Sequence, residues 1–145
     1  MEQTSDRLVG TWRLLSASST TSAGERNETP YGLHPVGFLT YTADGRVTAM
    51  ISNGGRKSLV GGGTLEEQAE AFKTFLAYAG RYTLSGDTIT HTVDISSIQT
   101  YVGKDLIRTV TFHDNQITLV TPPTPMNGKI RVFELIWERL TAVPE

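Results

Sequence analysis

The sequence predicts an all-β protein, an antiparallel barrel of about eight strands with one inserted helix near residues 65–79. Short segments rich in Thr, Val, Ile and aromatic residues recur along the chain, and turn signals such as Asp44-Gly45 separate them. A chain of 145 residues has the size of one domain, so residues 1–145 are expected to form a single barrel. The interior of an eight-stranded barrel is just wide enough for side chains or one small ligand.

The strands follow from alternating apolar and polar residues. Residues 18–27 are polar and rich in Ser and Thr, which is typical of a loop or a frayed strand end. The segment Pro122-Pro123-Thr124-Pro125, between the last two expected strands, is expected to break any strand pairing. The expected strands span residues 8–18, 37–42, 46–51, 80–84, 88–95, 106–112, 116–121 and 129–140.

The helix is predicted from its start signal and its spacing. Thr64 and Glu67 form a capping box, and Gly80 stands where a C-cap is expected. Because one amphipathic helix cannot bury its apolar side alone, we expect it to lie against the barrel or cover an open end, beside a mobile glycine-rich loop over residues 53–63. Its apolar residues at helical spacing are Leu65, Ala69, Phe72, Leu76 and Ala79.

Composition excludes several classes of function. The net charge of −2 and the lack of a basic cluster argue against nucleic acid or an anionic membrane as partner. The chain has no cysteine, which removes disulfides, thiol catalysis and Cys-ligated metals. The N-terminus lacks the pattern of a signal peptide and the longest apolar runs are far short of the ~20 residues of a membrane helix, so we expect a cytoplasmic protein.

Several short motifs occur in a fixed order along the chain. They are Gly10-Thr11-Trp12, Pro30-Tyr31-Gly32, the segment 35–41, Asp44-Gly45-Arg46, the segment 78–82, His91 and Trp137-Glu138-Arg139. Their combination resembles the lipocalin-like domain family of small bacterial and fungal calycin barrels. The resemblance implies that Trp12 plugs one end of the barrel and that Arg139 packs over its ring, a contact worth ~0.5–2 kcal/mol. It also implies that the first and last strands meet, so that the sheet has no free edge.

His91 is the first candidate for chemistry. Strand alternation places it on the same face as Ile89, Val93 and Ile95. If that face points inward, the imidazole stands in an apolar interior where it could donate or accept a proton. The alternative is a neutral histidine that is hydrogen-bonded within the core.

Arg108 alternates with Leu106, Val110 and Phe112, so it lies on an otherwise apolar face. A guanidinium is rarely buried without an anionic or hydrogen-bonding partner. The partner is either an internal acid such as Glu134 or a carboxylate, enolate or phenolate of a ligand. Glu134 itself alternates with apolar neighbours, so the strand pattern leaves open which side of the last strand faces the core.

Tyr41, Tyr82 and Tyr101 are candidates for lining a ligand site, with core or rim positions as the alternative. His34, His91 and His113 do not show the close spacing of metal ligands. We therefore expect neither a metal nor a cofactor.

These residues predict a barrel that encloses a small hydrophobic or aromatic metabolite. One version is a cofactor-free tailoring enzyme of secondary metabolism, an isomerase, cyclase or dehydratase. In it His91 acts as general acid and base, Arg108 stabilises negative charge and a tyrosine assists. The alternatives are a non-catalytic carrier or sensor and a structural barrel for protein partners. A homodimer is compatible with all of them.

Overall fold

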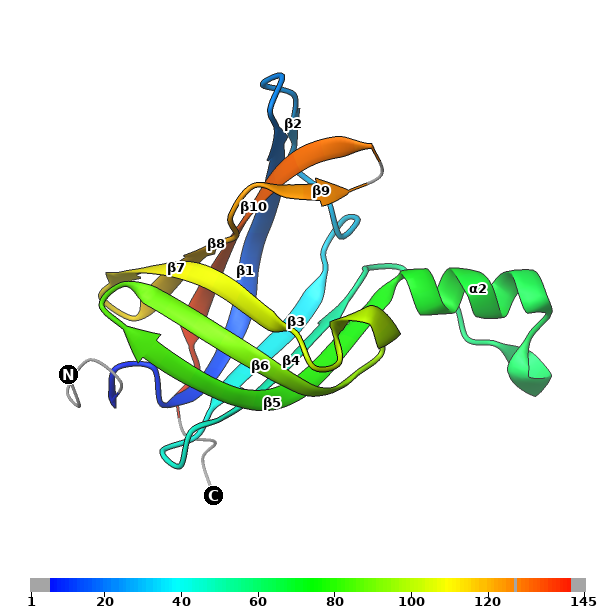
Figure 1. Cartoon of the computed structure of the whole chain (residues 1–145). Helices are drawn as coiled ribbons and strands as arrows, with labels where there is room; N and C mark the ends of the chain where they lie inside the picture. The colour runs from blue at the N-terminus through cyan, green and yellow to red at the C-terminus, as the bar shows by residue number, and fades with distance from the viewer. Residues whose placement is uncertain (1–5, 127, 142–145) are drawn as a thin grey trace.

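The computed structural model describes residues 6–126 and 128–141. In these residues ten strands form one antiparallel sheet, which closes on itself because β1 pairs with both β3 and β10. Figure 1 shows the resulting barrel, and the predicted fold class is confirmed. Eight strands make the barrel wall: β1 (Gly10–Thr21), β3 (Val36–Tyr41), β4 (Arg46–Ser52), β5 (Phe75–Ser85), β6 (Thr88–Ser96), β7 (Asp105–His113), β8 (Gln116–Val120) and β10 (Lys129–Arg139).

Two short strands that were not expected extend the sheet beyond the wall. β2 (Arg26–Asn27) pairs with the end of β1, which continues as a strand to Thr21, so of the two alternatives for this stretch residues 18–21 are a strand end. β9 (Thr124–Met126) pairs with the start of β10, with Pro125 opposite Ile130. Pro125 is tolerated because β9 lies at the edge of the sheet, where a missing backbone N–H leaves no partner unpaired.

The helix begins as predicted but ends early. α2 (Leu65–Lys73) starts with the expected capping box between Thr64 and Glu67. Residues 75–79, which were expected to continue the helix, instead form the start of β5 and pair with β4. Gly80 is therefore an interior strand residue and not a helix cap.

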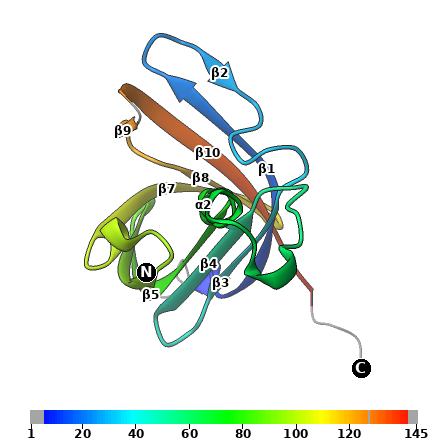
Figure 2. The same ribbon diagram turned by 90° about the vertical axis from the view of Figure 1, so that its right-hand side faces the viewer.

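The apolar side of α2 is exposed, and the prediction that it packs against the barrel is wrong. Leu65 is 84% exposed and Phe72 is 54% exposed. Figures 1 and 2 show α2 leaving the barrel as an arm between β4 and β5. The preceding loop holds this arm, because Arg56 donates hydrogen bonds to the carbonyl of Ala71 (3.0 Å) and to Oγ1 of Thr74 (3.2 Å). The 3-10 helix η1 (Val60–Gly62) lies within the same glycine-rich stretch.

One end of the barrel is closed by Trp12. Its ring is 1% exposed, its Nε1 donates to the carbonyl of Leu8 at 2.8 Å, and the guanidinium carbon of Arg139 lies 4.3 Å from its centre. Arg139 also donates to the carbonyl of Val9 at 2.5 Å. Gly10 makes room for it, because a Cβ at Gly10 would lie 2.7 Å from Nη1 of Arg139 and its φ of +133° disfavours other residues. We call the opposite end, where β1 ends and β10 begins, the mouth.

A bulge in β6 changes which residues face inward. Gly80 pairs with Val93 and Ala79 pairs with Ile95, so Asp94 is the additional residue. Val93 is therefore buried, whereas Ile95 is 67% exposed and does not share the inner face of His91 as predicted. Gly80 permits this close approach, because a Cβ there would lie 1.9 Å from the carbonyl oxygen of Thr92.

Candidate functional site

His91 lies inside the barrel, on the inner face of β6 between Ile89 and Val93, and is 1% exposed. Both of its ring nitrogens are hydrogen-bonded to tyrosines from other strands. The hydroxyl of Tyr41 on β3 lies 2.8 Å from Nε2, and the hydroxyl of Tyr78 on β5 lies 2.6 Å from Nδ1. The imidazole therefore connects strands β3, β5 and β6 across the interior.

This environment keeps His91 neutral. Burial, together with the positive charge of Arg108, lowers its pKa to about 3. A neutral imidazole has one N–H donor and one acceptor, so one tyrosine accepts a hydrogen bond from the ring and the other donates one to it. The ring can relay hydrogen bonds between the two phenols, but it does not hold a second proton at neutral pH.

The tyrosines around His91 are neutral as well. Burial raises the pKa of Tyr41 well above its ordinary value and raises that of Tyr78. Tyr82 packs edge-on against Tyr41 with ring centres 4.7 Å apart, and its hydroxyl donates to the carbonyl of Thr42 at 2.8 Å. Tyr82 therefore supports the Tyr41 ring and does not reach His91 through a hydrogen bond.

Arg108 faces inward from β7, on the same side as the buried Val110, and is partly buried. Its Nη1 donates to the carbonyl of Ile107 at 3.0 Å. Within residues 6–126 and 128–141, no carboxylate lies within ion-pair distance of its guanidinium. Besides His91, Arg108 affects Tyr78: its charge and a polar contact with the phenol oppose the effect of burial on the pKa of Tyr78.

Arg108 influences the pKa of two tyrosines at the mouth, Tyr31 and Tyr78. Burial raises the pKa of Tyr31 to about 12, and Arg108 acts against this increase. Tyr31 packs on Phe133 of β10 with ring centres 6.2 Å apart. Tyr101, in the 3-10 helix η2 (Gln99–Tyr101), lies near enough to affect the pKa of both Tyr31 and Tyr78. We call Tyr31, Tyr78, Tyr101, Arg108 and Phe133 the mouth cluster.

Of the predicted site residues, Tyr41, Tyr82, His91, Tyr101 and Arg108 lie in or beside this region. Glu134 does not, because it faces outward from β10 between the inward-facing Phe133 and Leu135.

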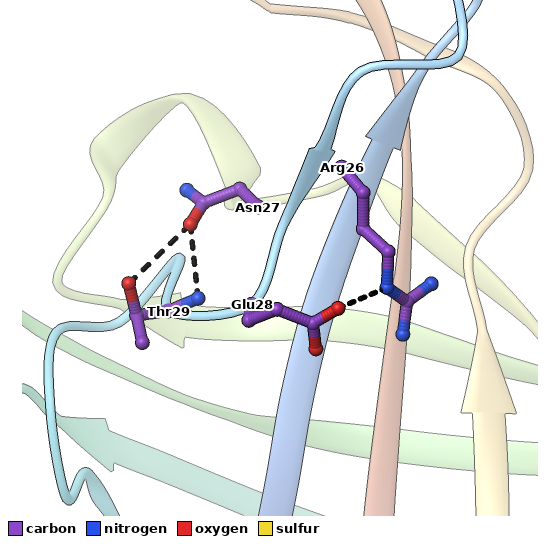
Figure 3. Close-up of polar contacts among 4 residues, drawn as sticks. All are labelled: Arg26, Asn27, Glu28 and Thr29. Carbon is purple, nitrogen blue, oxygen red and sulfur yellow. Dashed lines mark hydrogen bonds and ion pairs between the residues drawn. The ribbon is translucent and has the colours of Figure 1, made fainter.

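Glu134 lines a groove of about 270 Å³ on the outer side of β1 and β10. The segment after β2 forms the other side of this groove. Figure 3 shows β2 and the start of that segment, where Arg26 pairs with Glu28 and the backbone N–H of Thr29 donates to Oδ1 of Asn27 at 2.9 Å. The pairing of Arg108 with Glu134 that the sequence allowed is therefore not formed.

Sequence reasoning missed Tyr78 and Tyr31 as site residues. Tyr78 was hidden by the helix prediction, although its period-two spacing with Gly80 and Tyr82 is typical of one strand face. Tyr31 lies outside the strands, in a Pro-Tyr-Gly segment. Only its place in the family resemblance marked it.

The lipocalin-like domain family model matches residues 9–140. The chain belongs to this family. A lipocalin-like barrel is an architecture suited to a small hydrophobic ligand. A crystal structure of lipoprotein YedD from Klebsiella pneumoniae subsp. pneumoniae is similar at 12% identity, with a TM-score of 0.42 over 94% of this chain and 74% of that one. No curated protein matches the chain significantly.

In the part of the chain that the structure describes, no helix is long and apolar enough to span a membrane. Among the same residues, no three His, Cys, Asp or Glu side chains gather as metal ligands would.

Proposed function

We propose that this lipocalin-like protein binds a small, mostly apolar molecule that carries an acidic group, and that Arg108 pairs with that group at the mouth of the barrel. The observation that carries the proposal is the inward-facing guanidinium of Arg108, which has no carboxylate partner among the described residues. A partly buried cation is costly unless an anion or hydrogen-bond acceptors surround it. Arg108 uses one donor for the Ile107 carbonyl and makes a polar contact with Tyr78, whereas a guanidinium has five donors in all.

The rings of the mouth cluster favour an aromatic ligand. Tyr31, Tyr101 and Phe133 are all partly buried, so they combine apolar surface with access from solvent. At the Trp12 end, by contrast, Leu8 and Trp12 are at most 1% exposed. The greater exposure of side chains at the mouth supports entry of the ligand there. Aromatic faces also pack well on a planar apolar ligand.

The test compares acids with their neutral amides. Benzoate, cinnamate and 2-naphthoate are titrated into the protein by calorimetry, together with the three primary amides. We expect the acids to bind more tightly than the amides, and Arg108→Gln to weaken the acids about 10- to 100-fold, the loss expected for a charge-assisted hydrogen bond. Arg81→Gln is the matched control, because Arg81 lies exposed on the outer face of β5. Equal binding of acids and amides, or equal loss in both variants, contradicts the proposal.

A second candidate is a cofactor-free enzyme, an isomerase, cyclase or dehydratase of secondary metabolism. It is favoured by the chain of hydrogen bonds from Tyr41 through His91 to Tyr78, which ends beside Arg108. In this version the Tyr78 hydroxyl exchanges a proton with the ligand while Arg108 stabilises negative charge on oxygen. Because His91 is neutral, it acts as a relay and not as a cationic acid.

The variants Tyr78→Phe and His91→Gln distinguish the binding protein from the enzyme. Cinnamate, the one of the three acids whose double bond can isomerise, is incubated with the protein and followed by proton NMR. Conversion that both substitutions abolish, with affinity unchanged, supports the enzyme. A ligand that is unchanged by the wild-type protein supports the carrier.

A further inference from the structure

Ser19 presents a buried hydroxyl that the fold does not use. It lies on β1, is 2% exposed, and its Oγ has no hydrogen-bond partner among the described residues. Nε1 of Trp137 is also unpaired, but Trp137 pairs with Leu14 towards the closed half of the barrel. A buried polar group without a partner destabilises the fold, so it calls for an explanation such as a ligand contact.

The sheet register places Ser19 in the same ring of residues as Arg108. Ser19 pairs with Phe133 on β10, and the backbone N–H of Thr121 donates to the Phe133 carbonyl at 2.9 Å. On β7, Arg108 is the inward-facing residue at the level of Thr121, because Thr109 next to it pairs with Val120. The adjacent outward-facing row fixes this alignment through the pairs Ser18↔Glu134, Glu134↔Val120 and Val120↔Thr109.

Ser19 and Arg108 approach the interior from different walls. β1 and β7 are separated by β10 and β8, so they are three strands apart in a barrel of eight. With neighbouring strands about 4.8 Å apart, the two backbones are separated by roughly 14 Å along the curved sheet. Between these two strands, Phe133 on β10 pairs with Ser19 in the sheet, and Tyr31 packs on Phe133 with ring centres 6.2 Å apart. A ligand that contacts both Ser19 and Arg108 therefore carries its polar groups on opposite parts of an aromatic ring.

We propose that Ser19 is the second polar contact of the ligand, so that the barrel is selective for an aromatic acid whose ring also carries a hydroxyl or carbonyl group. This inference rests on the proposed function, in which Arg108 takes the acid. The ligand's second group gives the Ser19 hydroxyl the hydrogen bond it lacks in the protein.

The probes are benzoate and its three monohydroxy isomers, measured by calorimetry at pH 7.5. We expect at least one hydroxybenzoate to bind the wild-type protein about tenfold more tightly than benzoate, since about 1.4 kcal/mol corresponds to tenfold. In Ser19→Ala this preference disappears while benzoate affinity is unchanged. The matched control is Ser18→Ala, because Ser18 is the buried neighbour on the opposite face of β1 and lines the outer groove.

Folding of the variant is checked independently of binding. Ser19→Ala removes only an unpaired oxygen, so its Tm is expected to equal or exceed that of the wild-type protein. If benzoate binding depends on Arg108 but no hydroxybenzoate is preferred, or if the preference survives in Ser19→Ala, the role of Ser19 is overturned and the proposed function stands. If none of the four acids binds, both fail.

Discussion

Because the folded protein keeps His91 neutral, acid should destabilise it through this one side chain. The pKa of His91 is about 3 in the folded protein and 6.5 in an exposed histidine. Below pH 6.5 the unfolded chain binds a proton that the folded protein does not, so the free energy of unfolding falls as the pH falls. The contribution of His91 is complete above pH 6.5 and is lost progressively down to about pH 3.

The magnitude follows from the pKa difference. One proton changes the free energy of unfolding by about 1.4 kcal/mol per pH unit, so His91 should account for a loss of about 3 kcal/mol between pH 7 and pH 4. That is a large part of the 5–15 kcal/mol typical of a domain. His91→Gln, which cannot titrate, should lose less stability over the same range even if it is less stable at pH 7.

Urea unfolding followed by tryptophan fluorescence at several pH values measures this difference. Carboxylates titrate in both proteins, so only the difference between the two pH profiles reports His91. His113→Gln is the control, because His113 is exposed at the end of β7 and its loss should leave the wild-type profile unchanged. Parallel profiles for the wild-type protein and His91→Gln would refute the reasoning, as would an NMR titration of His91 with a midpoint near 6.5.

Two further predictions concern the barrel wall. Gly80→Ala should destabilise the protein by more than about 2 kcal/mol, because the new Cβ would meet the Thr92 carbonyl at 1.9 Å; an unchanged Tm in thermal melting would show that the bulge adjusts easily. Arg139→Met should cost about 1–3 kcal/mol, since it removes the cation over Trp12 and a donor to the Val9 carbonyl; urea unfolding measures it, and a cost below 0.5 kcal/mol would exclude Arg139 as a stabilising closure contact.

The strands were predictable because alternation and turn signals are local. The hairpin around Asp44-Gly45 is an example, since both of its strands were predicted to within one residue. The segment 75–79 was not predictable in the same way. Phe72, Leu76 and Ala79 fit a helix, whereas Leu76 and Tyr78 also fit a strand face, and pairing with β4 and β6 decides between them. That pairing is a property of distant residues, which a local pattern does not contain.

In the candidate site, too, local patterns predicted some features, whereas others depend on residues far apart in the sequence. Alternation placed His91 and Arg108 each on an apolar face of its own strand, and the structure shows that both of these faces point inward. The partners did not follow, since Tyr41 and Tyr78 reach His91 from strands 50 and 13 residues away. The outward direction of Glu134 also needed the structure, because β10 has apolar residues on both faces.

The structure assigns different tasks to the two residues that the sequence grouped as catalytic candidates. His91 is buried and neutral, and both of its ring nitrogens are hydrogen-bonded to tyrosines. These hydrogen bonds connect β3, β5 and β6. Arg108 is partly buried and charged, and the neutral phenols of Tyr31 and Tyr78 near it do not balance its charge. A ligand gains more from a cation with free donors than from a ring whose polar atoms are already paired. Ligand selectivity is therefore expected at the mouth, on β7 and β1, while the tyrosine–histidine contacts below it set the shape and the acid sensitivity of the barrel.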